Sequence, residues 1–382
     1  MDSLQKVSYL PLTLTLAASM ATMSFQTVIS PVMDLIAVAN GLSNFQTALL
    51  AAIVSLPNFL LTLPSGYILD RFNPIKLSLF NFILICLACF CLFFSRAYPT
   101  ILFFRFIGGL TFAPLIIMGT QLPILIYPKQ LHNRMVTIQT LGAPLATILA
   151  FYLGAFIGTH LGYTYVYIIP LILALTGVVI SLKLWSTKVE REVRKKEHNR
   201  LSRQTYIMMI IWFIFMFTTS IFLIQGTSIG LELGLTRTVA VFGASMLMIP
   251  ALIVSPIVGE VMDKRFSRLK LFVFASIVMA VSLALIPIGK TYWVVGAILL
   301  GLSSAIIPPI VFSSPSKFES SRTIARALAT FNFFGTMGIL ISPPVAGWLR
   351  DKTGTWTAPF IIATALCLLI TFISYEMRRD LK

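Results

Sequence analysis

The sequence predicts an all-α membrane protein with about twelve transmembrane helices in two six-helix bundles. Hydrophobic residues make up 57% of the 382-residue chain, while charged residues make up only 11%, and the mean hydropathy is +0.91. Soluble domains carry about 25% charged residues, so this composition excludes an ordinary soluble globule. Apolar stretches of span length fill the chain on both sides of one long charged stretch, residues 186–204.

The predicted spans are apolar stretches of about 20 residues or more, bounded by charged or turn-forming residues. They lie near residues 9–37, 44–69, 76–95, 98–126, 134–157, 163–185, 205–230, 238–262, 270–289, 292–315, 323–348 and 356–376. The charged stretch divides this series into equal halves. We therefore expect an N-terminal six-helix bundle at 1–185, a cytoplasmic basic linker at 186–204 and a C-terminal six-helix bundle at 205–382.

The two halves resemble each other in sequence. A Gly-x-x-x-Asp pattern ends the second span and recurs about 190 residues later, after the eighth span. Further landmarks recur at nearly the same spacing, namely Gly109 and Gly301, Arg134 and Arg326, and Gly162 and Gly354. An internal duplication of this length is typical of transporters built from parallel repeats.

The formal net charge is +16, which in a soluble protein would suggest a nucleic-acid or acidic partner. In a membrane protein, topology explains the charge, because cytoplasmic loops carry an excess of Lys and Arg. With a cytoplasmic N-terminus, the outer loops hold few of the 29 Lys and Arg, namely Arg96, Arg237, Lys290, Arg350 and Lys352. We therefore expect a multi-pass protein of the cell membrane with both termini cytoplasmic and no nucleic-acid partner. The basic linker is either solvated or in contact with anionic lipid.

Several motifs resemble those of the major facilitator superfamily. They are, in chain order, Gly66-x-x-x-Asp70-Arg71, Arg105-Phe-Ile-Gly-Gly109, Gly259-x-x-x-Asp263-Lys264 and Gly347-Trp-Leu-Arg-Asp351. The segment from Pro31 to Ser43 and on to Arg71 looks most like prokaryotic members that carry small organic anions. The resemblance covers nearly the whole chain. It implies two bundles that expose a central site alternately to each side of the membrane.

By this resemblance, the two Gly-x-x-x-Asp loops form a reversible cytoplasmic latch. The Gly lets two helices cross closely, and the Asp places a negative charge beside the positive N-terminal end of a helix in the other half. The first copy departs from the family pattern, because Asn73 stands where the family prefers Gly. The alternative is a short turn with an Asp cap. The expected gating residues are Gly66, Asp70, Arg71, Lys76, Gly259, Asp263, Lys264 and Arg268.

Arg105 is the one ionisable residue that falls clearly inside a predicted span. An ionised group in the membrane is expensive, so it faces a cavity or a partner rather than lipid. Three roles remain open. Arg105 binds an anion such as a carboxylate, takes part in proton coupling as the family motif implies, or bonds the carbonyls of a neighbouring helix.

Neutral amides complete the expected substrate site. Gln26, Asn58, Gln225 and Asn332 lie in predicted spans that line the central path in the superfamily. Each either contacts substrate or bonds another helix. Asp34, near the outer end of the first span, is the remaining candidate for a proton or cation site, with a solvated helix-end acid as the alternative.

The sequence contains no phosphate-binding Gly-x-x-x-x-Gly-Lys-[Ser/Thr] loop, no metal-ligand cluster and no nucleophile constellation. We therefore expect a secondary transporter rather than an enzyme, with no cofactor. The predicted substrate is a small organic or inorganic anion, moved with or without a coupling proton or ion by a monomer surrounded by membrane lipid. The alternatives are efflux of amphipathic drug-like compounds, and a non-transporting sensor or scaffold that retains the transporter fold.

Overall fold

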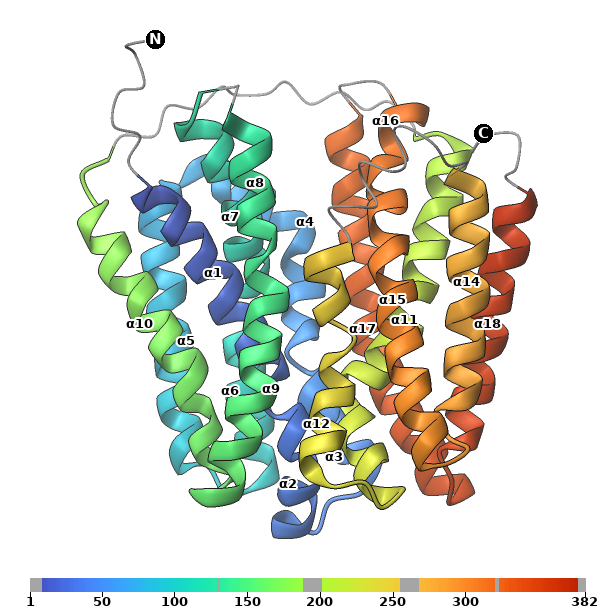
Figure 1. Ribbon diagram of the computed structural model, residues 1–382. Helices are drawn as coiled ribbons and strands as arrows, with labels where there is room; N and C mark the ends of the chain where they lie inside the picture. Colours follow the sequence, from blue (N-terminus) through green and yellow to red (C-terminus); the bar gives the residue numbers. More distant parts are fainter. Residues whose placement is uncertain (1–8, 129–130, 188–200, 255–267, 320–322, 377–382) are drawn as a thin grey trace. The chain divides into compact units, whose positions relative to one another are not determined.

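The computed structural model describes residues 9–128, 131–187, 201–254, 268–319 and 323–376, and every regular element within these ranges is a helix. Eleven helical stretches in them are long and apolar enough to cross a membrane. A shorter apolar helix, Leu269–Leu285, occupies the place of the ninth predicted span. The prediction of an all-α membrane protein with about twelve spans is confirmed (Figure 1).

The chain divides into two compact units. The first comprises Met1–Val28 and Leu56–Lys195, and the second comprises Ile29–Ser55 and Lys196–Lys382. Residues 29–55 belong to the N-terminal half in sequence, yet they pack within the second unit. The linker predicted at 186–204 falls mostly outside the described residues, so the predicted domain boundaries stay a prediction.

The first unit is organised around α1. Its helices are α1 (Leu10–Thr27), α4 (Ser55–Arg71), α5 (Pro74–Phe94), α6 (Tyr98–Gly109), α7 (Phe112–Ile126), α8 (His132–Thr140), α9 (Gly142–His160), the 3-10 helix η3 (Tyr163–Tyr167) and α10 (Ile168–Lys183). Helix α1 packs against α7, α9 and α10, and α5 packs against α6 and α10. Pro74 at the first turn and the Asn73 side chain, which accepts from the Ile75 and Lys76 N–H groups, explain where α5 begins.

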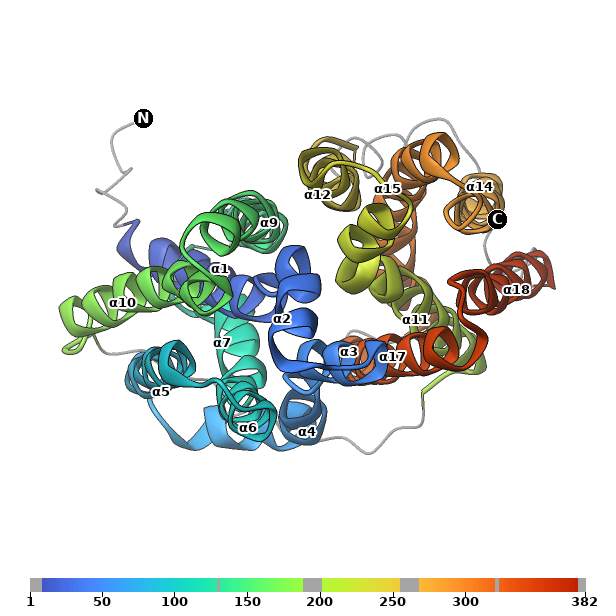
Figure 2. The ribbon, with the colours of Figure 1, turned by 90° about the horizontal axis from the view of Figure 1, so that it is seen from below.

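The second unit is organised around the long helix α11. Its elements are the 3-10 helix η1 (Ser30–Val32), α2 (Met33–Asn40), α3 (Asn44–Ala52), α11 (Arg203–Glu232), α12 (Arg237–Ser245), α14 (Arg268–Leu285), α15 (Lys290–Ser313), α16 (Pro315–Phe318), α17 (Ile324–Thr353) and α18 (Thr357–Glu376). Helix α11 packs against α17, α12 and α18, and α14 packs against α15 and α18. Helix α3 lies alongside α17 (Figure 2).

Several spans are broken near their middles. The first span is interrupted between Thr27 and Met33, where the chain passes through η1. The second span is interrupted at Ile53 and Val54, between α3 and α4. Pro31 and Pro57 lie at these two breaks, and a proline has no N–H to continue the helical hydrogen bonding. The chain can therefore change direction inside both spans.

Large apolar side chains are distributed as a membrane environment requires. Phe80, Phe156 and Phe372 are more than half exposed on the outsides of their units, which is favourable only against lipid. Inside the units, small residues allow helices to approach closely. Gly177 of α10 faces the buried ring of Phe82 in α5, for example, leaving no room for a side chain at position 177.

Candidate functional site

Arg105 lies in α6 and its side chain is completely buried. The guanidinium donates from Nη1 to the carbonyl oxygen of Phe25 at 3.3 Å and from Nη2 to that of Gln26 at 3.1 Å. Its Cζ atom also lies 5.5 Å from the centre of the Phe25 ring, within the range of a cation–π interaction. Of the roles that the sequence leaves open for Arg105, the structure shows the bonds to a neighbouring helix.

The local sequence explains why these carbonyls need a donor. Helix α1 ends at Thr27, and the last carbonyls of an α-helix have no partner within the helix. The C-terminal end of a helix also carries a partial negative charge, which a cation stabilises. Arg105 therefore acts as a positively charged cap on the broken end of the first span.

The Phe25 ring is held between Arg105 and the backbone of α6. A side chain at Gly108 would collide with this ring, so glycine at position 108 leaves room for the Phe25 ring against α6. The Tyr167 ring of η3 packs 6.2 Å from the Phe25 ring, and Tyr167 is itself buried beside the guanidinium. The motif that begins at Arg105 thus forms a packed helix junction.

The first unit brings only some of its predicted substrate residues together. Gln26 lies at the Arg105 junction, where its backbone carbonyl is an acceptor and its side chain is 7% exposed. Asn58 lies in α4 and is half-buried, and its backbone carbonyl accepts from the Thr62 hydroxyl at 2.6 Å.

The second unit contains the other two predicted amides. Gln225 of α11 is 2% exposed, and its Nε2 lies 3.5 Å from the Pro343 carbonyl oxygen, at the limit of a hydrogen bond. Its Oε1 is buried and accepts no hydrogen bond from the described residues. Asn332 of α17 is exposed. A buried amide oxygen without a donor is costly, which makes Gln225 the strongest candidate of this unit for contact with a solute.

An aromatic cluster lies in the same unit. Trp212 stacks on Phe215 with 5.2 Å between ring centres, and Phe312 meets Trp212 edge-on at 4.8 Å. Phe331 extends the cluster from Phe312. These rings fill the inside of the bundle, since Trp212, Phe215 and Phe331 are buried.

The predicted cytoplasmic latch lies largely beyond what the structure describes. Gly66, Asp70 and Arg71 belong to the end of helix α4, but their side chains are outside the described part of the structure. Gly259, Asp263 and Lys264 lie outside the described residues, and Arg268 is described only as the first residue of α14. Lys76 is exposed, with its ammonium 4.7 Å from the Trp185 ring centre. The latch therefore stays a prediction.

Asp34 is ion-paired in the structure. We call the end of each unit with few Lys and Arg the outer end, following the predicted orientation. There Arg237, the first residue of α12, donates to both carboxylate oxygens of Asp34, at 3.0 and 2.5 Å. The same guanidinium donates to the Pro31 carbonyl at 2.7 Å. A proton or cation site at Asp34 would have to compete with this partner.

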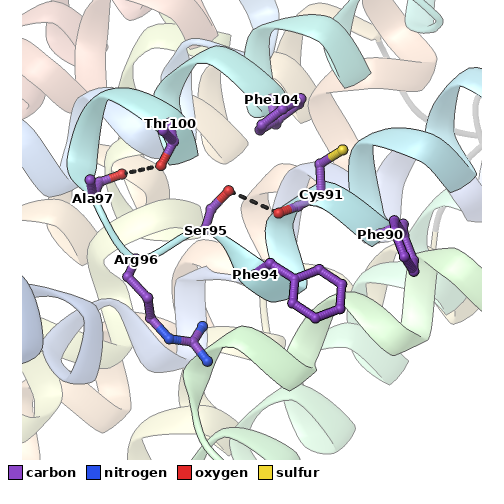
Figure 3. Close-up of a pocket in the computed structure, with 8 residues that line it drawn as sticks. All are labelled: Phe90, Cys91, Phe94, Ser95, Arg96, Ala97, Thr100 and Phe104. Atoms are coloured by element: carbon purple, nitrogen blue, oxygen red, sulfur yellow. Dashed lines mark hydrogen bonds between the residues drawn. The ribbon is translucent and has the colours of Figure 1, made fainter.

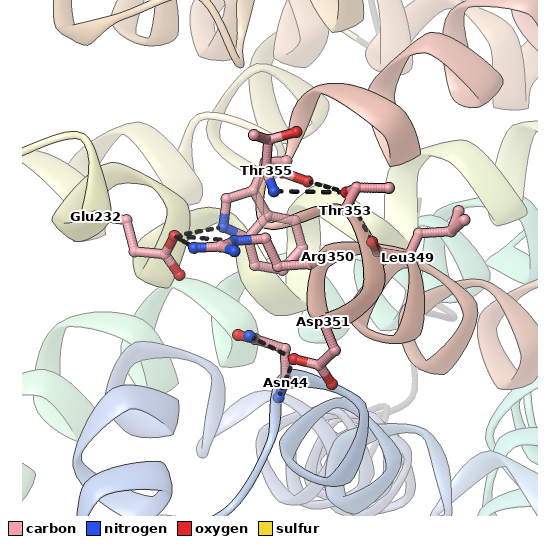
Figure 4. A network of polar contacts seen from close by, with 8 residues as sticks. Asn44, Glu232, Leu349, Arg350, Asp351, Thr353 and Thr355 are labelled. Carbon is pink, nitrogen blue, oxygen red and sulfur yellow. Dashed lines mark hydrogen bonds and ion pairs between the residues drawn. The ribbon is translucent and has the colours of Figure 1, made fainter.

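A second polar network joins the outer ends of α3, α11 and α17 (Figure 4). The Glu232 carboxylate accepts from Arg350 at 3.0 Å and from the Trp356 indole N–H at 2.9 Å. The Asp351 carboxylate accepts from the backbone N–H of Asn44 at 3.1 Å, from its side-chain amide at 2.8 Å, and from the Phe45 N–H at 2.9 Å. Asp351 thereby supplies acceptors to the N-terminus of α3.

At the inner end, Glu319 joins two helix starts. Its carboxylate accepts from the Ser202 N–H at 2.8 Å and from the Thr205 hydroxyl at 2.6 Å, at the start of α11. It also accepts from the Thr323 hydroxyl at 2.7 Å, just before α17. Burial raises the pKa of Glu319, but these hydrogen bonds outweigh burial and hold the pKa below its ordinary value.

A shallow hollow of about 470 Å³ lies at the outer ends of α5 and α6 (Figure 3). Its lining combines three phenylalanines with small residues and Arg96, and it contains none of the predicted site residues. The described residues contain no cluster of three or more His, Cys, Asp or Glu that could hold a metal ion.

The sequence model of the Major Facilitator Superfamily matches residues 14–225 and 207–380. The chain belongs to the major facilitator superfamily. The predicted family, and with it a protein of the transporter class rather than an enzyme, is confirmed. The fold agrees, because a solved structure of a bacterial homolog to the human lysosomal transporter Spinster, inward-facing and unoccupied, superposes with a TM-score of 0.76. That match covers 100% of this chain and 98% of that one at 15% identity.

Curated relatives match over shorter segments. The chain is 36% identical over 90 residues to monocarboxylate transporter 13 of Rattus norvegicus, which is 23% of this chain and 21% of the relative. It is 31% identical over 151 residues to multidrug resistance protein 1 of Bacillus subtilis (strain 168), covering 39% of this chain and 38% of the relative. The matched segments thus span well under half the length of these relatives.

Sequence reasoning missed the outer networks. Arg237 was placed in an outer loop and Asp351 in a family-like motif, but neither was given a partner and Glu232 was not singled out, because the partners are distant in sequence. One signal was present, since Gly347 and Asp351 have the Gly-x-x-x-Asp spacing of the two predicted latch loops.

Proposed function

We propose that the protein is a secondary transporter of the major facilitator type that moves a small organic or inorganic anion by alternating access. The observation that carries the proposal is the sign of the buried charge. Arg105 is the only charged side chain among the buried residues that the structure describes. The described acids Asp34, Glu232, Asp351 and Glu319 all lie at the ends of helices. A positive interior attracts anions and repels cations.

The roles within the site follow from the contacts. The Arg105 guanidinium donates to the carbonyls of Phe25 and Gln26 and thereby holds α1 in place. Its positive charge also attracts the anion. Direct contact falls to the neutral amides of Gln26, Asn58, Gln225 and Asn332. Each amide carries N–H donors for an anion.

Similarity to monocarboxylate transporters supports a small carboxylate, since such relatives recur among the matches, including monocarboxylate transporter 12 of Xenopus laevis at 25% identity over 176 residues. A second candidate is efflux of amphipathic compounds. The similarity to the Bacillus multidrug resistance protein and the aromatic cluster around Trp212 support it.

The proposal also includes the setting. The protein lies in the cell membrane with both termini cytoplasmic and works as a monomer among lipids, with a coupling proton or ion where transport is active. The excess of Lys and Arg in the predicted inner loops supports this orientation. The loops that contain Asp70 and Asp263 form the cytoplasmic latch, as the sequence predicts.

The test is a ligand-stabilisation screen on detergent-purified protein with small carboxylates, inorganic anions, sugars and hydrophobic cations. Each ligand-induced shift in Tm is measured against the same variant without ligand, for wild type, Arg105→Gln and Gln225→Leu. A carboxylate or inorganic anion that stabilises wild type but neither variant is the expected result. Stabilisation by hydrophobic cations that is indifferent to Arg105 would overturn the anion proposal in favour of efflux.

A further inference from the structure

Residues 29–55 form a distinct piece of the second unit. They comprise η1, α2 and α3, which are the outer part of the first predicted span and the outer half of the second. Helix α3 packs on α17, and η1 packs on α11. Residues 29–55 are therefore held by helices of the C-terminal half of the chain.

Helix α3 depends on Asp351 for its N-terminal hydrogen bonds. The first N–H groups of a helix have no partner within it. Ser43 accepts the third of them, from Gln46, in a capping box. The first two, from Asn44 and Phe45, donate to Asp351 of α17. A carboxylate at this position also interacts favourably with the helix dipole.

Glycine makes this contact possible. A Cβ atom at Gly347, one turn before Asp351, would lie 2.5 Å from the Asn44 carbonyl oxygen and 2.9 Å from the Phe45 nitrogen. Any side chain at position 347 would therefore push α3 away from α17. Gly347 and Asp351 perform at the outer end the two functions that the sequence assigns to the Gly-x-x-x-Asp loops at the inner end.

Arg237 provides a second attachment. Its guanidinium forms a two-pronged ion pair with Asp34 and bonds the Pro31 carbonyl. Both partners lie in residues 29–55, so α12 holds the start of this segment while α17 holds its middle. The ion pair is partly exposed, with side-chain exposures of 23% for Arg237 and 30% for Asp34, so water can compete for it.

Both ends of the segment coincide with helix breaks. The boundary between the units falls after Val28 and after Ser55. The first lies in the interruption that contains Pro31, and the second lies between the turn at Ile53–Val54 and Pro57. Breaks at both ends allow the segment to bend away while the rest of each span stays helical.

We propose that Ile29–Ser55 is an outer gate, held shut by an outer latch formed by Gly347, Asp351 and Arg237, and that it opens by bending at the two breaks. Opening exchanges the Asp351 and Arg237 contacts for water at the outer surface. The inference requires only that the central site is exposed alternately to each side of the membrane. It does not depend on the identity of the solute.

The test measures how often the gate opens. The native cysteines Cys86, Cys89, Cys91 and Cys367 are replaced by Ala, and Ala48→Cys places one thiol in α3 at a position that is fully buried. Intact cells are treated with a membrane-impermeant maleimide, and the rate of labelling is recorded. Asp351→Asn removes the charge of the latch, Gly347→Ala prevents the close approach without changing any charge, and Lys352→Gln is the neighbouring control.

We expect Asp351→Asn to raise the labelling rate about tenfold, because it weakens the hydrogen bonds that a charged group accepts from α3. We expect a similar rise in Gly347→Ala, because the added Cβ atom would push α3 away from Asp351. Lys352→Gln should label at the wild-type rate. Adding Pro31→Ala to Asp351→Asn restores a backbone N–H at the break and should slow labelling again.

Wild-type labelling rates in both latch variants would overturn the proposal, as would equal acceleration by Lys352→Gln. Labelling only after the cells are opened would show that this end is not outside. An unchanged labelling rate when Pro31→Ala is added to Asp351→Asn would show that the gate does not bend at the first break. Size-exclusion profiles identify any variant that fails to fold. If one latch variant fails to fold, the labelling rate of the other latch variant decides the test.

Discussion

Removing the Arg105 guanidinium should destabilise the first unit strongly. In Arg105→Gln, the carbonyls of Phe25 and Gln26 lose their charged donor in a site with no exposure. The bond to Gln26 has ordinary length, whereas the bond to Phe25 at 3.3 Å is long and counts for less. With the helix-end charge effect added, the loss is about 3–5 kcal/mol.

The assay is unfolding of the purified protein in detergent, followed by Tm and by denaturant midpoint. A loss of this size corresponds to a decrease in Tm on the order of 10 °C. Arg105→Lys keeps a charge but only one donor group, so it should lose less. Arg96→Gln is the matched control, because Arg96 is exposed and donates to the Phe93 carbonyl.

Arg105→Gln would refute the reasoning if it unfolded like the Arg96→Gln control. The cap on α1 would then contribute little, and Arg105 would be kept for the solute alone. Strong destabilisation together with a retained anion-induced shift in Tm would instead assign Arg105 to structure and leave anion binding to the amides.

Three further predictions concern other contacts. Glu319→Gln should lower the free energy of unfolding by about 1 kcal/mol at pH 7, a value discounted for partial exposure. Because the pKa of Glu319 is lowered in the folded protein, the stabilisation is fully present above the ordinary glutamate pKa of about 4.3 and is lost as the pH falls through the lower pKa of the folded state, below which wild type and variant should unfold alike. Gly177→Ala should cost about 1–3 kcal/mol because the buried Phe82 ring leaves no room, whereas Gly289→Ala meets open space and should unfold like wild type. Asp34→Asn should lower the free energy of unfolding by about 1 kcal/mol, and the double swap Asp34→Arg with Arg237→Asp should recover most of it, so a swap no better than its single variants would contradict the pairing.

The sequence predicted the helices and the family because both leave local marks. Apolar stretches of span length and the repeated Gly-x-x-x-Asp pattern need no knowledge of distant contacts. The role of Arg105 could not be decided in this way, because the carbonyls that it caps carry no sequence signature. The pairing of Asp34 with Arg237 was hidden for a similar reason, since 203 residues separate the partners.

The domain organisation shows the same limit. A charged linker marks the middle of the chain plainly, but the packing of residues 29–55 depends on the fit between α3 and α17. Position 347 is one glycine among 22, and only the structure shows that its missing side chain is what admits the Asn44 backbone.

The dependence of α3 on Asp351 also has a consequence for biosynthesis. Asn44, at the start of α3, and Asp351 are separated by 307 positions. At about 5–20 residues per second, roughly 15–60 s pass between the synthesis of the two residues. During this interval the first hairpin sits in the membrane without the carboxylate that completes its second helix, and only water or lipid headgroups can serve its N–H groups. The first spans to be inserted are therefore among the last to reach their final hydrogen bonding, after nearly the whole chain has left the ribosome.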